Sequence, residues 1–337
     1  MFSAHVLPKV ELHLHLDCSL SYEVVARIDP TVTRSDFERD FIAPAKCTNL
    51  ADYLTRARHG IAMMQTEQEL RWVTADLFEQ LRKDNILYAE IRFAPLLHTQ
   101  KGLTPEQVVE IIDSEATRAS MASGVEARLI LCTLRHFTNE QSMETVMLVR
   151  RFRGKLVAAL DIAGDEAGYP VNAHIPAFRH AMTNNVPRTA HAGEALGATS
   201  VWETLKHFQP TRIGHGVRSI EDAGLIEHLK QTRIHLEICP TSNVQTDVIG
   251  AIGDHPANRL YSAGVSVGIN TDARTISNVT LANEYEVLHR QFGWSTEHFR
   301  TCNMNALEAA FLPEKTKRQL ADRLLLAYQG LEGSASH

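Results

Sequence analysis

Side chains that can bind a metal ion or move protons stand at the ends of β-like segments of this sequence. His13 and His15 lie two residues apart in the segment KVELHLH, so a strand directs both imidazoles to the same face. Later segments end in the same kinds of side chain, namely His191 and Glu194 in HAGE, His215 in GHG, and Asp272 in NTD. Imidazoles and carboxylates at one end of several strands predict a metal site with acid–base groups beside it.

The residue types in this set favour zinc. Burying several imidazoles and carboxylates without a partner is unfavourable, and a divalent cation supplies that partner. Three histidines and one aspartate suit Zn²⁺, which accepts nitrogen and oxygen ligands and keeps a position for water. Fe²⁺, Co²⁺ and Mn²⁺ remain alternatives for the same ligands. A single histidine would indicate little, because the chain has 17 histidines and most histidines are ordinary surface or core residues.

Eight β-like segments supply the ends at which these side chains stand. Most are continuous apolar runs, as in strands that are buried on both faces of a parallel sheet. Amphipathic segments separate them, including Pro105–Met121 after the N-cap residue Thr104, Val201–His207 and Ile220–Lys230. The alternation predicts an α/β fold, a (β/α)8 TIM barrel, with a doubly wound open sheet as the alternative. The β-like segments are Val10–Leu16, Ile86–Phe93, Ala127–Leu134, Leu156–Ile162, Arg188–His191, Arg212–Gly214, Ile234–Ile238 and Val265–Asn270.

The first two β-like segments are unusually far apart. About 70 residues separate them, whereas one crossover helix needs far fewer. Thr48–Met64 and Glu67–Arg82 both have helical patterns. We therefore expect extra helices inserted at about residues 20–85, over the carboxyl ends of the strands, where they form a pocket wall or a lid. No linker or repeat divides the chain, so residues 1–337 are predicted to form one barrel domain.

The composition of the chain argues against several classes of function and of binding partner. The formal charge is −6 and Lys and Arg form no run, which argues against a nucleic-acid partner. The five cysteines are scattered and contain no CxxC pair, so neither a disulfide framework nor a thiolate zinc site is indicated. Neither a secretory signal pattern nor a membrane-length apolar run is present. We expect a cytoplasmic protein without a membrane partner, and its oligomeric state stays open.

The motifs resemble the adenosine deaminase family of metal-dependent amidohydrolases. They occur in the family's order and span nearly the whole chain. Two-metal relatives carry a carbamylated lysine after the fourth strand, but this region reads LDIAGDE, so the resemblance implies one Zn²⁺ per chain. The matching stretches are LHLHLD (12–17), DIAGDE (161–166), HAGE (191–194), GHG (214–216), CPTSN (239–243) and NTD (270–272).

The resemblance also implies roles for individual residues. Glu194 would shuttle protons to the purine, and His215 would orient the attacking hydroxide. Asp17 would bind the ribose 5′-hydroxyl and the Gly164 N–H would meet purine N3, although a loop cap and a tight turn are the simpler explanations of these two. Glu166, Asp165 and Asp161 are expected to be structural hydrogen-bonding groups. The metal ligands would be His13, His15, His191 and Asp272, with His15 also facing the substrate.

Two positions depart from the family pattern. Many adenosine deaminases have a second aspartate after the metal-binding one, where it hydrogen-bonds purine N7, and here Ala273 and Arg274 follow Asp272. A methyl group cannot make that bond, so water, backbone or Arg274 must supply it if it is kept. Cys18 replaces the glycine that commonly follows HLD. These departures affect the identity of the substrate rather than the core chemistry.

The expected activity is deamination of adenosine or 2′-deoxyadenosine, with a small-molecule purine nucleoside as the binding partner. Zinc lowers the pKa of bound water from about 15.7 to about 7, which makes hydroxide available at neutral pH. A modified adenine nucleoside, such as aminodeoxyfutalosine or methylthioadenosine, is the alternative substrate. Free adenine fits less well, because adenine-specific relatives tend to carry Glu at the position of Asp17. Nucleotides fit less well, because an acid near the 5′ position would repel a phosphate. Another metal-dependent amide or lactone hydrolase and a noncatalytic barrel are the other classes considered.

Overall fold

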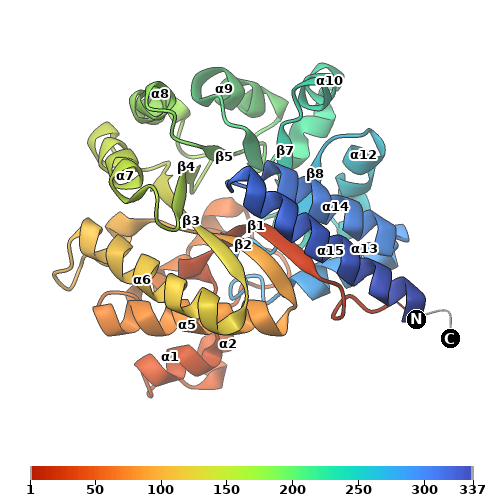
Figure 1. Cartoon of the computed structure of the whole chain (residues 1–337). Helices are drawn as coiled ribbons and strands as arrows, with labels where there is room; N and C mark the ends of the chain where they lie inside the picture. Colours follow the sequence, from red (N-terminus) through yellow and green to blue (C-terminus); the bar gives the residue numbers. More distant parts are fainter. Residues whose placement is uncertain (1, 335–337) are drawn as a thin grey trace.

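The computed structural model describes residues 2–334 and contains a closed barrel of parallel strands within them (Figure 1). Hydrogen-bonded pairing gives two four-stranded sheets, in the orders β1-β2-β3-β4 and β5-β6-β7-β8. Parallel bridges between Leu14 and Asp272 and between Leu160 and Arg188 join the two sheets at both seams. The strands are β1 (Lys9–His15), β2 (Ile86–Phe93), β3 (Glu126–Leu134), β4 (Val157–Ala163), β5 (Thr189–Ala192), β6 (Arg212–His215), β7 (His235–Ile238) and β8 (Val267–Ile269). The predicted TIM barrel is confirmed.

The strands are buried on both faces because helices surround them. Nearly every strand residue is buried, which explains the continuous apolar runs in the sequence. Figure 1 shows helices α5 to α10 and the C-terminal helices arranged around the strands. These outer helices are α6 (Pro105–Ser123), α7 (Asn139–Phe152), α8 (Ile175–Thr183), α9 (Ala198–Phe208), α10 (Ala223–Thr232), α12 (Ala257–Ser262), α13 (Leu281–Phe292), α14 (Thr296–Ala309) and α15 (Glu314–Ser334).

Local sequence signals set several helix ends. The Thr104 side chain accepts a hydrogen bond from Gln107 N while the Gln107 side chain accepts one from Thr104 N, so the predicted N-cap of α6 is confirmed as a capping box. The predicted helix Ile220–Lys230 is divided. Its first residues belong to the 3₁₀ helix η4 (Val217–Glu221), because Asp222 caps α10 by accepting from Gly224 N.

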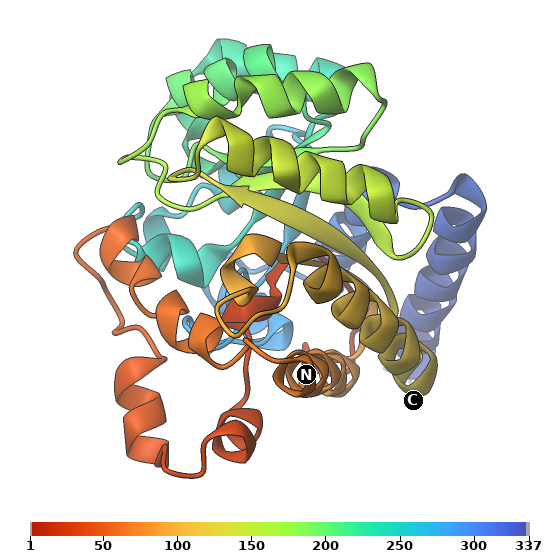
Figure 2. The same ribbon diagram turned by 90° about the vertical axis from the view of Figure 1, so that its left-hand side faces the viewer.

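The long segment between β1 and β2 is helical, as expected. It contains α1 (Tyr22–Ile28), α2 (Arg34–Asp40), α3 (Leu50–Leu54), α4 (Ala57–Ala62) and α5 (Glu67–Lys83). In Figure 2 the red and orange helices at the start of this segment lie together at the lower left. That residues 1–337 form a single domain, with residues 20–85 as its insertion, stays a prediction.

The helical pattern over Thr48–Met64 corresponds to two short helices, because α3 ends at Leu54 and α4 begins at Ala57. Thr55 Oγ1 donates to the Asp52 carbonyl at 2.6 Å, and this side-chain bond competes with continued α-helical pairing. No helix among residues 2–334 has the length and hydropathy of a membrane span.

Candidate active site

The candidate metal ligands come together at the carboxyl end of the barrel. Donor atoms of His13, His191, His215 and Asp272 all lie within 4.8 Å of one another. His15 joins them, because its Nε2 lies 3.3 Å from His191 Nε2 and 3.4 Å from Asp272 Oδ1. These residues come from β1, β5, β6 and the segment after β8, so the barrel collects side chains that are up to 259 positions apart in sequence.

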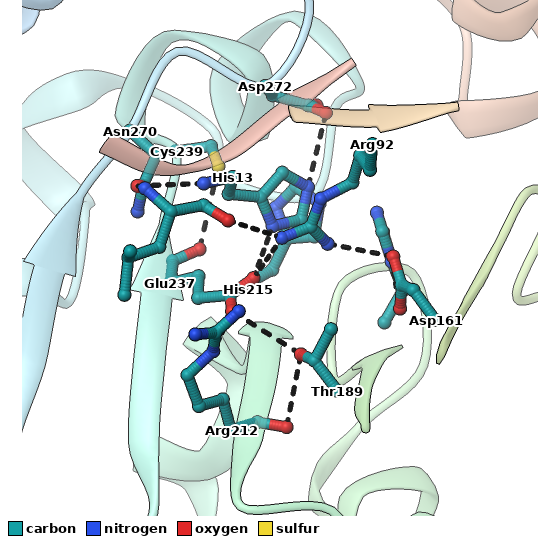
Figure 3. Close-up of polar contacts among 12 residues, drawn as sticks. His13, Arg92, Asp161, Thr189, Arg212, His215, Glu237, Cys239, Asn270 and Asp272 are labelled. Atoms are coloured by element: carbon teal, nitrogen blue, oxygen red, sulfur yellow. Dashed lines mark hydrogen bonds and ion pairs between the residues drawn. The ribbon is translucent and has the colours of Figure 1, made fainter. Parts of the chain in front are cut away.

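Carboxylates hold two of the imidazoles with one nitrogen directed into the cluster. His13 Nδ1 lies 2.9 Å from Glu237 Oε2 (Figure 3). His191 Nδ1 lies 3.1 Å from Asp161 Oδ2. Within the described residues, His13 Nε2 is buried without a well-formed hydrogen bond, and it lies 3.3 Å from Asp272 Oδ1. A ring held by a carboxylate at Nδ1 presents the Nε2 lone pair to a cation, which is the usual arrangement of metal-bound histidine. The donor set therefore fits a metal ion.

The charges in the barrel interior fit a divalent ion in particular. Three carboxylates pair with two guanidinium groups, and His13 connects a fourth carboxylate to them. The set has an excess of two negative charges when the histidines are neutral, as metal ligands must be. Unbalanced buried charge is strongly unfavourable, and one divalent cation balances this excess. The carboxylates are those of Asp272, Asp161, Glu237 and Glu90, and the guanidinium groups are those of Arg92 and Arg212.

His215 differs from the other histidines of the cluster. The side-chain amide of Asn243 donates to His215 Nδ1 at 3.1 Å, so a neutral ring carries its proton on Nε2. This Nε2 lies 3.6 Å from Glu194 Oε2. Burial, followed by the neighbouring His13, lowers the pKa of His215 well below its ordinary value and keeps the ring neutral. A neutral Nε2–H can donate to a water molecule or an oxyanion, and in this tautomer Nε2 has no free lone pair for a metal ion.

Backbone strain accompanies the cluster. His215 and Asp272 have φ values of 60° and 63°, which are left-handed conformations that non-glycine residues rarely adopt. Backbone hydrogen bonds hold Asp272 in place, since its N–H donates to His13 O and its carbonyl accepts from His15 N. The strained backbone turns the carboxylate toward the cluster, and Ser242 Oγ donates to Asp272 Oδ2 at 2.7 Å.

Glu194 is a buried carboxyl group beside this cluster. Burial, together with the carboxylates of Asp272 and Glu166, raises its pKa well above the ordinary value. Glu166 anchors the loop that carries it, because its oxygens accept from Gly193 N at 2.8 Å, Glu194 N at 3.0 Å and Leu196 N at 2.9 Å. A buried carboxyl group whose pKa is raised in this way is suited to donate a proton to a substrate.

A cavity with two unlike walls opens beside the cluster. One wall is polar and includes Glu194 and Gly164 along with the histidines and Asp272. Gly164 has a φ of 97°, a conformation that favours glycine and turns the backbone after β4 toward the cavity. The other wall is mainly apolar and is formed by Cys18, Leu50, Tyr53, Leu54, Ala273 and Ile276. Three of these residues come from α3, so the inserted helices do form a pocket wall.

Two of the residues singled out in the sequence do not line this cavity. Arg274 is buried, and its Nη2 lies 2.6 Å from Glu11 Oε2 and 3.0 Å from Asp84 Oδ2. Since its guanidinium group is held there, Arg274 does not replace the missing N7-binding aspartate. Asp17 lies just outside the cavity lining, with Oδ2 3.6 Å from His98 Nε2.

Sequence reasoning overlooked Glu237, Arg92 and His98. Glu237 and Arg92 stand inside strands and point into the barrel, where apolar side chains are the usual occupants. A charged residue within an otherwise apolar strand was the available signal for both. His98 lies in the 3₁₀ helix η2 (Pro95–His98), which follows the end of β2. Because the active-site residues of a barrel stand after the carboxyl ends of its strands, this position could have identified His98 as a candidate.

Comparison with known proteins agrees with this geometry. The profile of the adenosine deaminase family matches residues 8–327. The chain belongs to the adenosine deaminase family. It is 35% identical over 325 residues to an adenosine deaminase of Clostridium acetobutylicum, covering 94% of this chain and 97% of that protein.

Solved structures of similar proteins share the fold. ADAL from Arabidopsis, solved with IMP, has a TM-score of 0.87 and 25% identity, covering 97% of this chain and 98% of that one. An adenine deaminase from Arthrobacter aurescens has a TM-score of 0.87 at 24% identity, covering 95% and 98%, and shows the fold alone. As a member of the adenosine deaminase family, the chain is a hydrolase that acts on C–N bonds of cyclic amidines.

Proposed function

We propose that this enzyme catalyses zinc-dependent hydrolytic deamination of adenosine and 2′-deoxyadenosine to inosine and 2′-deoxyinosine, with release of ammonia. The position of Glu194 supports this most strongly. Its buried carboxyl group, with a raised pKa, shares one cavity wall with the donor cluster and Gly164. This arrangement serves a substrate that must be protonated on one side and attacked by water at the adjacent carbon.

His13, His15, His191 and Asp272 hold one zinc ion in this proposal. Bound zinc supplies Lewis acidity that lowers the pKa of water from about 15.7 to about 7. Glu237 and Asp161 keep the rings of His13 and His191 in the orientation that metal binding requires. The ligand set is that expected from the sequence, with His215 close by as a fifth side chain.

Glu194 and His215 carry the proton and orientation steps. Glu194 donates its proton to purine N1, which makes C6 more electrophilic. It then takes up the two protons of the water that adds to C6, passes one to the departing amine and keeps the other, so that ammonia leaves and the carboxyl group is restored. The Nε2–H of His215, close to Glu194, hydrogen-bonds the attacking water and aims it at C6. The Gly164 N–H binds purine N3. Asp17, beside His98 at the end of β1, receives the ribose 5′-hydroxyl.

A panel of purines tests the substrate. Purified, zinc-loaded enzyme is given adenosine, 2′-deoxyadenosine, adenine, AMP, methylthioadenosine and aminodeoxyfutalosine, and ammonia release and the change in ultraviolet absorbance are measured. We expect the two unmodified nucleosides to have the highest kcat/KM. Activity on adenine but not on nucleosides would contradict the role of Asp17, and a preference for AMP would show that its carboxylate does not exclude phosphate.

The Glu194→Gln variant tests the proton donor. The amide has nearly the same shape but no acidic proton, so we expect kcat to fall by about 10²- to 10⁴-fold while zinc content and folding are kept. Glu203→Gln is the matched control, because Glu203 lies exposed on α9 and the charge change is the same. Near-normal turnover by Glu194→Gln would remove Glu194 from the mechanism.

A further inference from the structure

A run of buried ion pairs crosses the barrel interior next to the donor cluster (Figure 3). Arg212 joins Glu90 to Glu237, with Nη2 2.5 Å from Glu90 Oε2 and Nε 2.7 Å from Glu237 Oε1. Arg92 continues the run, with Nη2 2.7 Å from Glu237 Oε2 and Nη1 2.8 Å from Asp161 Oδ2. All five side chains are fully buried. The charges alternate along the run, and it contains both carboxylates that orient histidines, Glu237 in the middle and Asp161 at one end.

Arg92 has a distinctive place in this run. Within the described residues, its guanidinium group contacts both Glu237, which binds His13 Nδ1, and Asp161, which binds His191 Nδ1. We infer that Arg92 is a positioning residue that fixes these two imidazoles relative to each other for one metal ion. The inference rests on the proposed metal site and adds to it the group that couples its two halves, β1 and β5.

The remaining contacts of the two carboxylates leave them little freedom to rotate. Asp161 Oδ1 accepts from Ile162 N at 2.7 Å, and Glu237 Oε1 is held by Arg212. Arg92 Nη2 also donates to the Leu12 carbonyl at 2.6 Å, directly before His13 in the chain. From β2, the guanidinium group therefore holds β1, β4 and β7 together.

The simultaneous contacts of Arg92 with Glu237 and Asp161 depend on the planar shape of its guanidinium group. Two different nitrogens of Arg92 reach carboxylates on two strands, and a lysine ammonium is a single point that lacks this fork. Replacing Arg92 by lysine keeps the positive charge but removes the simultaneous contact. This substitution therefore tests the positioning role of Arg92 separately from its contribution to charge balance.

The test compares metal binding by Arg92→Lys and Arg212→Lys. Zinc affinity is measured by competition with a chromophoric chelator, and the geometry of the site by the visible absorption of Co²⁺-substituted protein. We expect Arg92→Lys to bind zinc about 10- to 100-fold more weakly, with an altered Co²⁺ spectrum. Arg212→Lys is the matched comparison, since Arg212 is equally buried but contacts only Glu237 of the two carboxylates, and its loss of affinity is expected to be smaller.

The remaining outcomes of this test would contradict either the inference about Arg92 or the proposed function. Unchanged zinc affinity and Co²⁺ spectrum in Arg92→Lys, or an equal loss in Arg212→Lys, would overturn the inference. If circular dichroism shows that Arg92→Lys is unfolded, a double-mutant cycle of Glu237→Gln and Asp161→Asn replaces it, and additive losses of zinc affinity would overturn coupling through Arg92. Wild-type protein that binds zinc but deaminates no purine would contradict the proposed function and leave the role of Arg92 standing.

Discussion

The Nε2 atoms of His15 and His191 lie 3.3 Å apart, although the residues belong to β1 and β5 on opposite sides of the barrel. Two imidazole nitrogens this close share a proton or a cation. Burial lowers the pKa of His15 to about 3 and also lowers that of His191, so neither ring holds an extra proton at neutral pH. In the proposed function, this pair marks the point at which the metal ion would join the two halves of the barrel.

Replacing Glu166 by glutamine should loosen the loop that carries Glu194. The glutamine amide has one acceptor oxygen, so its NH₂ group would face backbone N–H groups that now donate to the Glu166 carboxylate. We expect a loss of about 1–3 kcal/mol in unfolding free energy, and a fall in kcat larger than the change in KM. Urea denaturation and steady-state kinetics measure the two effects. A variant with lower stability but wild-type kcat would show that Glu166 does not position Glu194.

Gly214→Ala should disturb His13 from the neighbouring strand. A Cβ at position 214 would lie 2.9 Å from His13 Cε1 and 3.2 Å from its Nδ1, and His13 is fixed by Glu237. We expect about 1–3 kcal/mol of destabilisation and weaker zinc binding, measured by thermal unfolding and chelator competition. Gly330→Ala is the control, because nothing lies within 4 Å of its added Cβ on exposed α15. Wild-type zinc affinity in Gly214→Ala would contradict the close fit.

The apolar wall at Ala273 should make the enzyme indifferent to purine N7. Gly164 follows β4 and Ala273 follows β8, on opposite sides of the barrel, so a purine with N3 at Gly164 turns its N7 edge toward Ala273. We expect similar kcat/KM values for adenosine and 7-deazaadenosine. Ala273→Ser introduces a donor and should favour adenosine by about 2- to 10-fold. A wild-type enzyme that strongly rejects the 7-deaza analogue would show that another group binds N7.

Glu284 should make stability depend on pH. Burial raises its pKa to about 8, against 4.5 for the ordinary carboxyl group, so the folded protein holds a proton that the unfolded chain releases. Its stabilisation is complete below about pH 4.5 and is lost as the pH rises toward 8. Glu284→Gln should remove this dependence, because a neutral amide can still accept from Thr241 N. Denaturation at pH 5 and pH 8 should show a smaller difference for the variant than for the wild type.

Local sequence patterns were sufficient to predict much of the fold. The eight apolar segments lie within a few residues of the observed strands, because burial on both faces requires apolar residues along most of a strand. The spacing of His13 and His15 placed both rings correctly, since alternate residues of a strand share a face. The break between α3 and α4 was missed because it depends on the side-chain hydrogen bond of Thr55 rather than on hydrophobic period.

The sequence by itself determined which side chains are available for metal binding and at which strand ends they stand, because strand period and apolar continuity are local properties. Only the tertiary structure decided which carboxylate holds which imidazole, that Arg92 joins Glu237 to Asp161, and that Arg274 is held away from the cavity. These contacts join residues far apart in the chain. They depend on strand register and on the closure of the barrel, which no local pattern encodes.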